Sequence, residues 1–252
     1  MSPETATHGG HGLVAHHFES LEQQREAGTF GMWVFLASEI LFFGGLFMAY
    51  SVMRFGGLGT MDPTGWRMAA NKLNATLGGI NTALLLTSSL TMALAVWSSQ
   101  MKNGKLLRLF LALTMTFSAA FLCVKAYEWY HEYEEGLVPR PAQVYADGKG
   151  EGFGYKPDGE KAEQVKDVPT AQARSMAMFF VFYFIITGLH ALHMIVGLGV
   201  LIALLVLAAR GRFGDPRDFV PVDVAGLYWH FVDIVWIFVF PILYLLREQG
   251  GG

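Results

Sequence analysis

Glu39 is the residue of this sequence whose surroundings point most clearly to chemistry. It is the only charged residue in the apolar run 29–53, ten residues from the start of that run. An ionisable group at such a depth in a bilayer costs about 2.5 to 3.5 kcal/mol, so it needs a partner or a function. Aromatic neighbours at helical spacing favour the neutral acid, which can give and take a proton. We interpret Glu39 as a buried, proton-exchanging carboxyl or a contact to a partner subunit; the alternative is a neutral acid hydrogen-bonded between helices.

Four further polar side chains are expected inside the membrane. Asp233 follows His230 by one helical turn, so its carboxylate could accept a hydrogen bond from that imidazole. His190 and His193 share one face of another apolar run. Together the four predict an intramembrane polar cluster, which is either a proton relay or a set of hydrogen bonds between helices.

These residues do not make a recognisable metal or haem site. Glu128 and His131 have the spacing used by di-iron bundles, but such bundles need a second Glu-x-x-His pair and two more carboxylates. A haem held by His190 and His230 would be an unusual construction. The single Cys123 excludes a site with two thiolates. We therefore expect no catalytic residue, no metal site and no cofactor bound by this chain.

Charged residues near the ends of the apolar runs are candidates for contacts with lipid or with another subunit. Lys125 and Glu128 are three residues apart and predict an ion pair at the membrane edge, worth a few tenths of a kcal/mol. The candidates for lipid or subunit contacts are Lys125, Glu128, Arg210, Arg212, Arg217 and Trp229.

The composition is that of a membrane protein. Of 252 residues, 53% are hydrophobic and only 15% are charged, whereas a soluble domain has about 25% charged residues. The net charge of −3 argues against a nucleic-acid partner. No basic start followed by a short apolar stretch is present, so we expect no cleavable signal peptide.

Five apolar runs predict an all-α, polytopic membrane protein with a bundle of five transmembrane helices, because about 20 apolar residues cross the hydrocarbon. The runs are 29–53, 73–101, 106–130, 175–209 and 224–246, and Pro241 should kink the last one. We expect an extramembrane tail at 1–28, a membrane domain at 29–247 with an extramembrane loop at 132–173, and a C-terminal tail at 248–252.

The orientation follows from the short connections. Basic residues in the turns after the second and fourth runs favour a cytoplasmic N-terminus and an outer C-terminus, in what we take to be a bacterial plasma membrane. The N-terminal tail contains His8, His11, His16 and His17, which could bind a metal ion, relay protons or simply be solvated.

Four strings resemble one known family. They are Ser-Glu-Ile-Leu-Phe-Phe at 38–43, Lys-Ala-Tyr-Glu-Trp at 125–129, Thr-Gly-Leu-His-Ala-Leu-His at 187–193 and Tyr-Trp-His-Phe-Val-Asp-Ile-Val-Trp at 228–236. In this order they look like subunit III of haem-copper terminal oxidases, the cytochrome c oxidase type. The resemblance runs from about residue 28 to residue 246, and longer members have seven helices, of which this chain matches the last five.

The resemblance implies a cofactor-free subunit that binds oxidase subunits I and II, with haem and copper in those partners and structural phospholipids in a cleft. It also implies that Glu39 matches the carbodiimide-reactive carboxyl of the family, and that the subunit sustains proton uptake and turnover stability of subunit I. Membership of a larger respiratory supercomplex is compatible with it. The alternatives are a quinol oxidase subunit III, the subunit-III-like protein of a nitric oxide reductase, and an independent transporter or haem-binding protein.

Overall fold

The computed structural model describes residues 21–55, 61–138, 140–144, 151–154, 170–210 and 220–245. Five helices in this part of the chain are long and apolar enough to cross a membrane, which confirms the predicted all-α polytopic architecture. They are α1 (Leu21–Phe55), α3 (Ala75–Gln100), α4 (Gly104–Glu134), α5 (Thr170–Ala209) and α6 (Val220–Phe240), the last continued by the π-helical turn η3 (Pro241–Leu245). The predicted kink at Pro241 is therefore a change from α-helix to π-helix.

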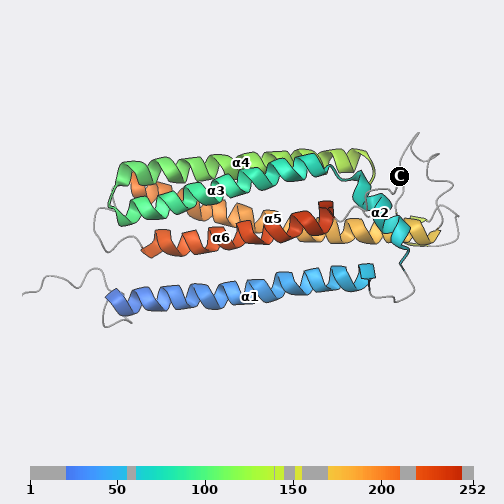
Figure 1. Cartoon of the computed structure of the whole chain (residues 1–252), viewed down its shortest axis with the longest axis horizontal. Coiled ribbons are helices and arrows are strands. Elements are labelled where there is room, and N and C mark those ends of the chain that lie inside the picture. The colour runs from blue at the N-terminus through green and yellow to red at the C-terminus, as the bar shows by residue number, and fades with distance from the viewer. Residues whose placement is uncertain are drawn as a thin grey trace, which may run out of the picture.

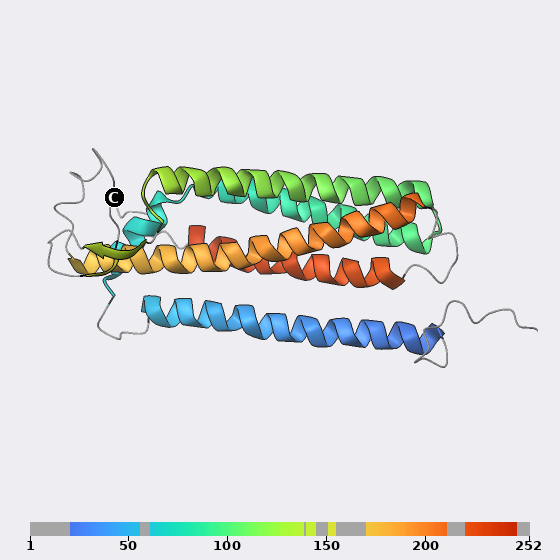
Figure 2. The same cartoon turned by 180° about the vertical axis from the view of Figure 1, so that it is seen from behind.

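Helices α3, α4, α5 and α6 pack side by side, and α1 lies along the outside of this bundle next to α6 (Figures 1 and 2). Accordingly α1 is the least buried of the five and α6 the most buried. The short helix α2 (Pro63–Lys72) lies at the end of the bundle where α1 finishes and α3 starts. We call this the α2 end.

Helix α4 extends beyond its predicted apolar run of 106–130 at both ends, where its terminal backbone groups are capped. Helix α4 has 31 residues, or about 46 Å, against a hydrocarbon core of about 30 Å. It ends where Gly136 adopts a φ of 71°, and the Leu137 amide then donates to the Glu132 carbonyl oxygen, as in a Schellman cap. The predicted loop 132–173 thus begins too early, because Glu132 is still helical and buried.

Helix α2 was not predicted, although its start has clear signals. The Asp62 side chain accepts from the Thr64 amide at 2.7 Å, and Pro63 occupies the first helical position. Helix α2 packs on the projecting start of α5, where a Cβ atom on Gly65 would collide with the backbone of Gln172. The connection between α4 and α5 contains a two-stranded antiparallel hairpin, β1 (Arg140–Val144) and β2 (Glu151–Gly154).

Tyr50 joins three elements at the α2 end. Its hydroxyl donates to the Ile242 carbonyl oxygen of η3 at 3.0 Å and accepts from the Trp66 indole N–H of α2 at 3.2 Å. Arg54 also donates to this oxygen, at 3.2 Å. The Tyr50 side chain is 1% exposed, so its hydroxyl is shielded from water. The end of α1 is therefore fixed to α2 and to the end of α6.

Candidate functional site

The candidate site is a contact between Glu39 of α1 and His193 of α5. The Oε2 atom of Glu39 lies 3.1 Å from Nε2 of His193, and the two side chains are 19% and 16% exposed. Both lie within spans that are otherwise apolar, Glu39 near the middle of α1 and His193 past the middle of α5. The structure thus supplies the partner that an acid at this depth requires.

The hydrogen bond of the second ring nitrogen of His193 determines which atoms of the pair carry hydrogen. Its Nδ1 atom lies 2.7 Å from the Leu189 carbonyl oxygen, and a carbonyl oxygen can only accept, so Nδ1 must carry a hydrogen. The contact between Nε2 and Glu39 then holds one proton, either on a neutral carboxylic acid that donates to Nε2 or on an imidazolium that donates to a carboxylate. In both forms the pair has no net charge, which suits a low-dielectric site.

Aromatic side chains hold the His193 ring in place. The Phe43 ring, 2% exposed, meets the imidazole edge-on with 5.3 Å between centroids. Tyr228 of α6 donates to the His193 carbonyl oxygen at 2.9 Å. The aromatic neighbours expected around Glu39 enclose it only in part, because Phe35 and Phe42 are 41% and 46% exposed. Glu39 is therefore half-buried within this chain.

An apolar groove of about 390 Å³ lies beside the pair, between α1 and α6. It begins near Trp33 and Leu36 on α1 and is closed on the other side by residues of α6 such as Ile234 and Phe238. His230 is its one strongly polar lining side chain. The groove therefore offers hydrocarbon-like surface next to the acid of α1.

The predicted polar cluster is divided among separate contacts. His193 meets Glu39, whereas His230 places Nδ1 2.7 Å from the Ser89 hydroxyl of α3 rather than against Asp233. Asp233 is 3% exposed, and neither of its carboxyl oxygens has a hydrogen-bond partner in the described structure. His190 is 1% exposed and stacks in the core, its ring centroid 5.0 Å from that of Trp236. The predicted Asp233–His230 bond is therefore wrong.

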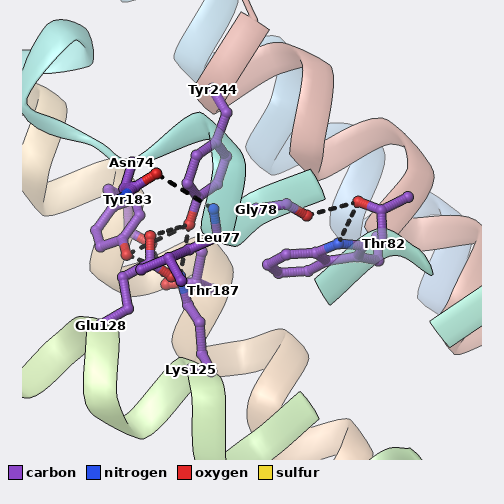
Figure 3. A network of polar contacts seen from close by, with 10 residues as sticks. Asn74, Leu77, Gly78, Thr82, Lys125, Glu128, Tyr183, Thr187 and Tyr244 are labelled. Atoms are coloured by element: carbon purple, nitrogen blue, oxygen red, sulfur yellow. Dashed lines mark hydrogen bonds and ion pairs between the residues drawn. The ribbon is translucent and has the colours of Figure 1, made fainter. Parts of the chain in front are cut away.

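A second polar group, at the α2 end, is more extensive than the sequence suggested (Figure 3). The Lys125 ammonium lies 2.8 Å from Glu128 Oε2 and donates to the hydroxyls of Tyr183 and Tyr244, each at 2.7 Å. Tyr244 in turn donates to Glu128 Oε1 at 2.7 Å. The side chains come from α4, α5 and η3, so the group ties three elements together.

This geometry corrects three of the predicted lipid or subunit contacts. Lys125 and Glu128 are 2% and 4% exposed, because the two tyrosine hydroxyls replace the water expected around an ion pair at the membrane edge. Trp229 is 1% exposed and donates to the Ser88 hydroxyl at 3.0 Å. None of the three faces lipid or a partner.

Other predicted candidates are less constrained by the structure. Arg210 is exposed just after the end of α5. Arg212, Arg217 and the four histidines of the N-terminal tail lie outside the described residues.

The tyrosine partners were missed because a tyrosine in an apolar helix was counted only as apolar. The available signal was the buried hydroxyl itself, since a tyrosine inside a membrane helix needs a hydrogen-bond partner. Lys125 and Glu128 offered that partner from a neighbouring helix.

Comparison with known proteins identifies the family of this chain. The family model described as cytochrome c oxidase subunit III matches residues 12–134 and 164–247. This chain belongs to the cytochrome c oxidase subunit III family. It is thus a haem-copper oxidase subunit III, and both Glu39 and His193 lie within the matched residues.

Three similar proteins show how this family varies. The chain is 28% identical over 217 residues to cytochrome c oxidase subunit 3 of Corynebacterium diphtheriae, covering 86% of this chain and 87% of that protein. It is 26% identical over 237 residues to a probable quinol oxidase subunit 3 of Staphylococcus haemolyticus, covering 93% and 96%. It is also 30% identical over 215 residues to a haem-copper oxidase subunit I+III of Aeropyrum pernix, covering 85% of this chain and 22% of that longer protein.

Proposed function

We propose that this chain is the non-catalytic subunit III of a proton-pumping cytochrome c oxidase in aerobic respiration. In this role it binds subunit I, assembles with subunit II and phospholipids, and supports proton uptake and turnover stability of the complex. It acts in the bacterial plasma membrane with its N-terminus in the cytoplasm.

The observation that carries this proposal is the contact between Glu39 and His193. The pair shares one proton between a carboxyl and an imidazole, so the proton can change sites without creating net charge in the membrane. A subunit that assists proton movement can use such a group, and the contact supports the proposal in this way.

The Aeropyrum pernix relative supports a partnership with subunit I. Its name joins subunits I and III, and the present chain matches 22% of its length. A single chain that carries both parts keeps them in one complex. We infer the same association here between separate chains.

Haem and copper belong to the partner subunits in this proposal. Among the residues that the structure describes, no three His, Cys, Asp or Glu side chains converge as a metal site requires. The apolar groove between α1 and α6 and the wide exposed surface of α1 supply places for phospholipid chains.

Gentle detergent purification followed by identification of the co-purifying chains tests the assignment. Recovery of haem-copper subunits I and II is expected, and recovery of a nitric oxide reductase instead would contradict the assignment.

Removing the subunit should slow oxygen consumption or shorten the active lifetime of the remaining complex. Complete loss of oxygen reduction with subunits I and II still assembled would contradict the accessory role.

The name of the Staphylococcus haemolyticus relative favours a second candidate, a quinol oxidase subunit III. The purified complex distinguishes the two by its reductant. Oxygen consumption driven by reduced cytochrome c supports the first assignment, and consumption driven only by a quinol supports the second.

A further inference from the structure

Glu132, on the last turn of α4, is a buried acid that faces the Tyr183 hydroxyl but makes no hydrogen bond of ordinary geometry in the described structure. Its side chain is 4% exposed, and neither carboxyl oxygen makes a hydrogen bond in the described structure. An unpaired carboxylate in such a place would lose its hydration without compensation, which is costly. The residue belongs to neither the Glu39–His193 contact nor the bonds of the Lys125 ammonium.

The group around Glu132 has more acids than bases. On α4 the neighbouring charges are Lys125, Glu128 and Glu135, and the facing titratable side chains are Tyr183 of α5 and, beside Glu128, Tyr244 of η3. Lys125 supplies one positive charge, which Glu128 already neutralises at 2.8 Å. A second carboxylate would leave the enclosed group with an uncompensated negative charge.

A path to water lies one residue away in the sequence. His131 is 64% exposed at the surface of α4, and its Nε2 atom lies 3.5 Å from Oε1 of Glu135, which is 26% exposed. Glu135 follows Glu132 by three residues at the end of α4, a spacing that places two side chains on one face of a helix. An imidazole has one nitrogen that can donate and one that can accept a proton, so this exposed pair can hand protons between water and a neighbouring acid.

We propose that Glu132 is a proton-binding site at the α2 end, loaded and unloaded through the His131–Glu135 pair. A hydronium ion in the aqueous phase gives its proton to the surface pair, the pair passes a proton to the Glu132 carboxylate, and the reverse sequence releases it. With the proton bound, the enclosed group of Lys125, Glu128 and Glu132 has no net charge. This site lies toward the opposite end of the bundle from the start of α1 and does not depend on Glu39.

Infrared spectroscopy of the purified full-length chain at neutral pH tests the proposal. Wild type should show a carboxylic acid C=O band that Glu132→Gln removes, while Glu134→Gln leaves it, because Glu134 is exposed on the same turn. If Glu132→Gln fails to accumulate, Glu132→Asp should shift the frequency of the same band. The proposal is overturned if Glu132→Gln removes only carboxylate absorption. It is also overturned if neither Glu132→Gln nor Glu132→Asp changes the carboxylic acid band.

The exchange path has its own readout. Transfer of the protein into D₂O should shift the Glu132 band, and His131→Ala should slow this shift several-fold. A matched change at the exposed Tyr130, Tyr130→Phe, should leave the rate unchanged. Equal rates in wild type and His131→Ala would contradict the role of the surface pair.

Discussion

The Oε2 atom of Glu39 and the Nε2 atom of His193 are 3.1 Å apart, although 154 residues separate them in the sequence. The contact closes α1 against α5 in a protein where α1 is otherwise widely exposed. Because the other nitrogen of the ring is held by a backbone carbonyl oxygen, the imidazole cannot turn away without losing a second hydrogen bond. The Glu39 carboxyl and the His193 imidazole are therefore held in contact.

Glu39→Gln should keep α1 in place but abolish carbodiimide labelling. The amide N–H can donate to Nε2 in the way the carboxylic acid does, yet an amide has no carboxyl to react. Mass spectrometry of labelled peptides measures this. Glu26→Gln, an exposed change on the same helix, should leave labelling at Glu39 intact; labelling of wild type at exposed acids alone would contradict the prediction.

Lys125→Met should destabilise the protein by about 3 to 5 kcal/mol, because it leaves the enclosed Glu128 carboxylate without its counter-charge. The double variant Lys125→Met with Glu128→Leu should recover much of this loss, since no unpaired charge remains. Thermal unfolding in detergent gives the comparison. Lys105→Met, at an exposed position of α4, is the control. A Lys125→Met protein as stable as that control would show that the ion pair is incidental.

Gly197→Ala should loosen the packing of α5 on α6. A Cβ atom there would lie 2.8 Å from the Trp229 ring and 3.0 Å from the Tyr228 ring, so these side chains would have to shift, at about 1 to 3 kcal/mol. Gly199→Ala on the same helix meets nothing within 4 Å and serves as the control. Equal unfolding temperatures for the two variants would refute the close approach.

Ser89→Ala should change the environment of His230, whereas Asp233→Asn should not. The hydroxyl of Ser89 is the partner of His230 Nδ1 at 2.7 Å, and its loss should cost about 1 kcal/mol. Nitrogen NMR of labelled histidine reports the Nδ1 atom directly. If the His230 Nδ1 signal changed more in Asp233→Asn than in Ser89→Ala, the Asp233 carboxylate would be the partner of His230 after all.

The apolar runs predicted the five membrane helices because hydrocarbon demands long uncharged segments, whatever their partners are. The ends of the helices were less predictable. Glu132 looks like the start of a polar loop, but the cap at Gly136 keeps it helical, and its side chain is buried. Helix α2 has too few apolar residues to signal a membrane span, so the cap at Asp62 and Pro63 was its sequence signal.

The candidate site was half predictable. Glu39 was predictable because an acid in the middle of an apolar run has a high free-energy cost of membrane insertion. His193 was predictable as a histidine inside a membrane span. Their pairing was not predictable, because spacing along one helix says nothing about which residue of another helix faces it. The same reason explains why His230 was assigned to Asp233, its neighbour in sequence, when Ser89 of α3 holds it.

The attachment of α1 has a consequence for biosynthesis. Its polar contacts to α5 and η3 use His193 and Ile242, which the ribosome adds long after α1 has been made. During that interval α1 has to reside in the bilayer with Glu39 still unpaired, at the insertion cost of about 2.5 to 3.5 kcal/mol for an acid at that depth. Only when α5 and α6 have followed can α1 be captured. Its docking is thus a late step of assembly, and a chain truncated before residue 193 would present the Glu39 carboxyl to lipid.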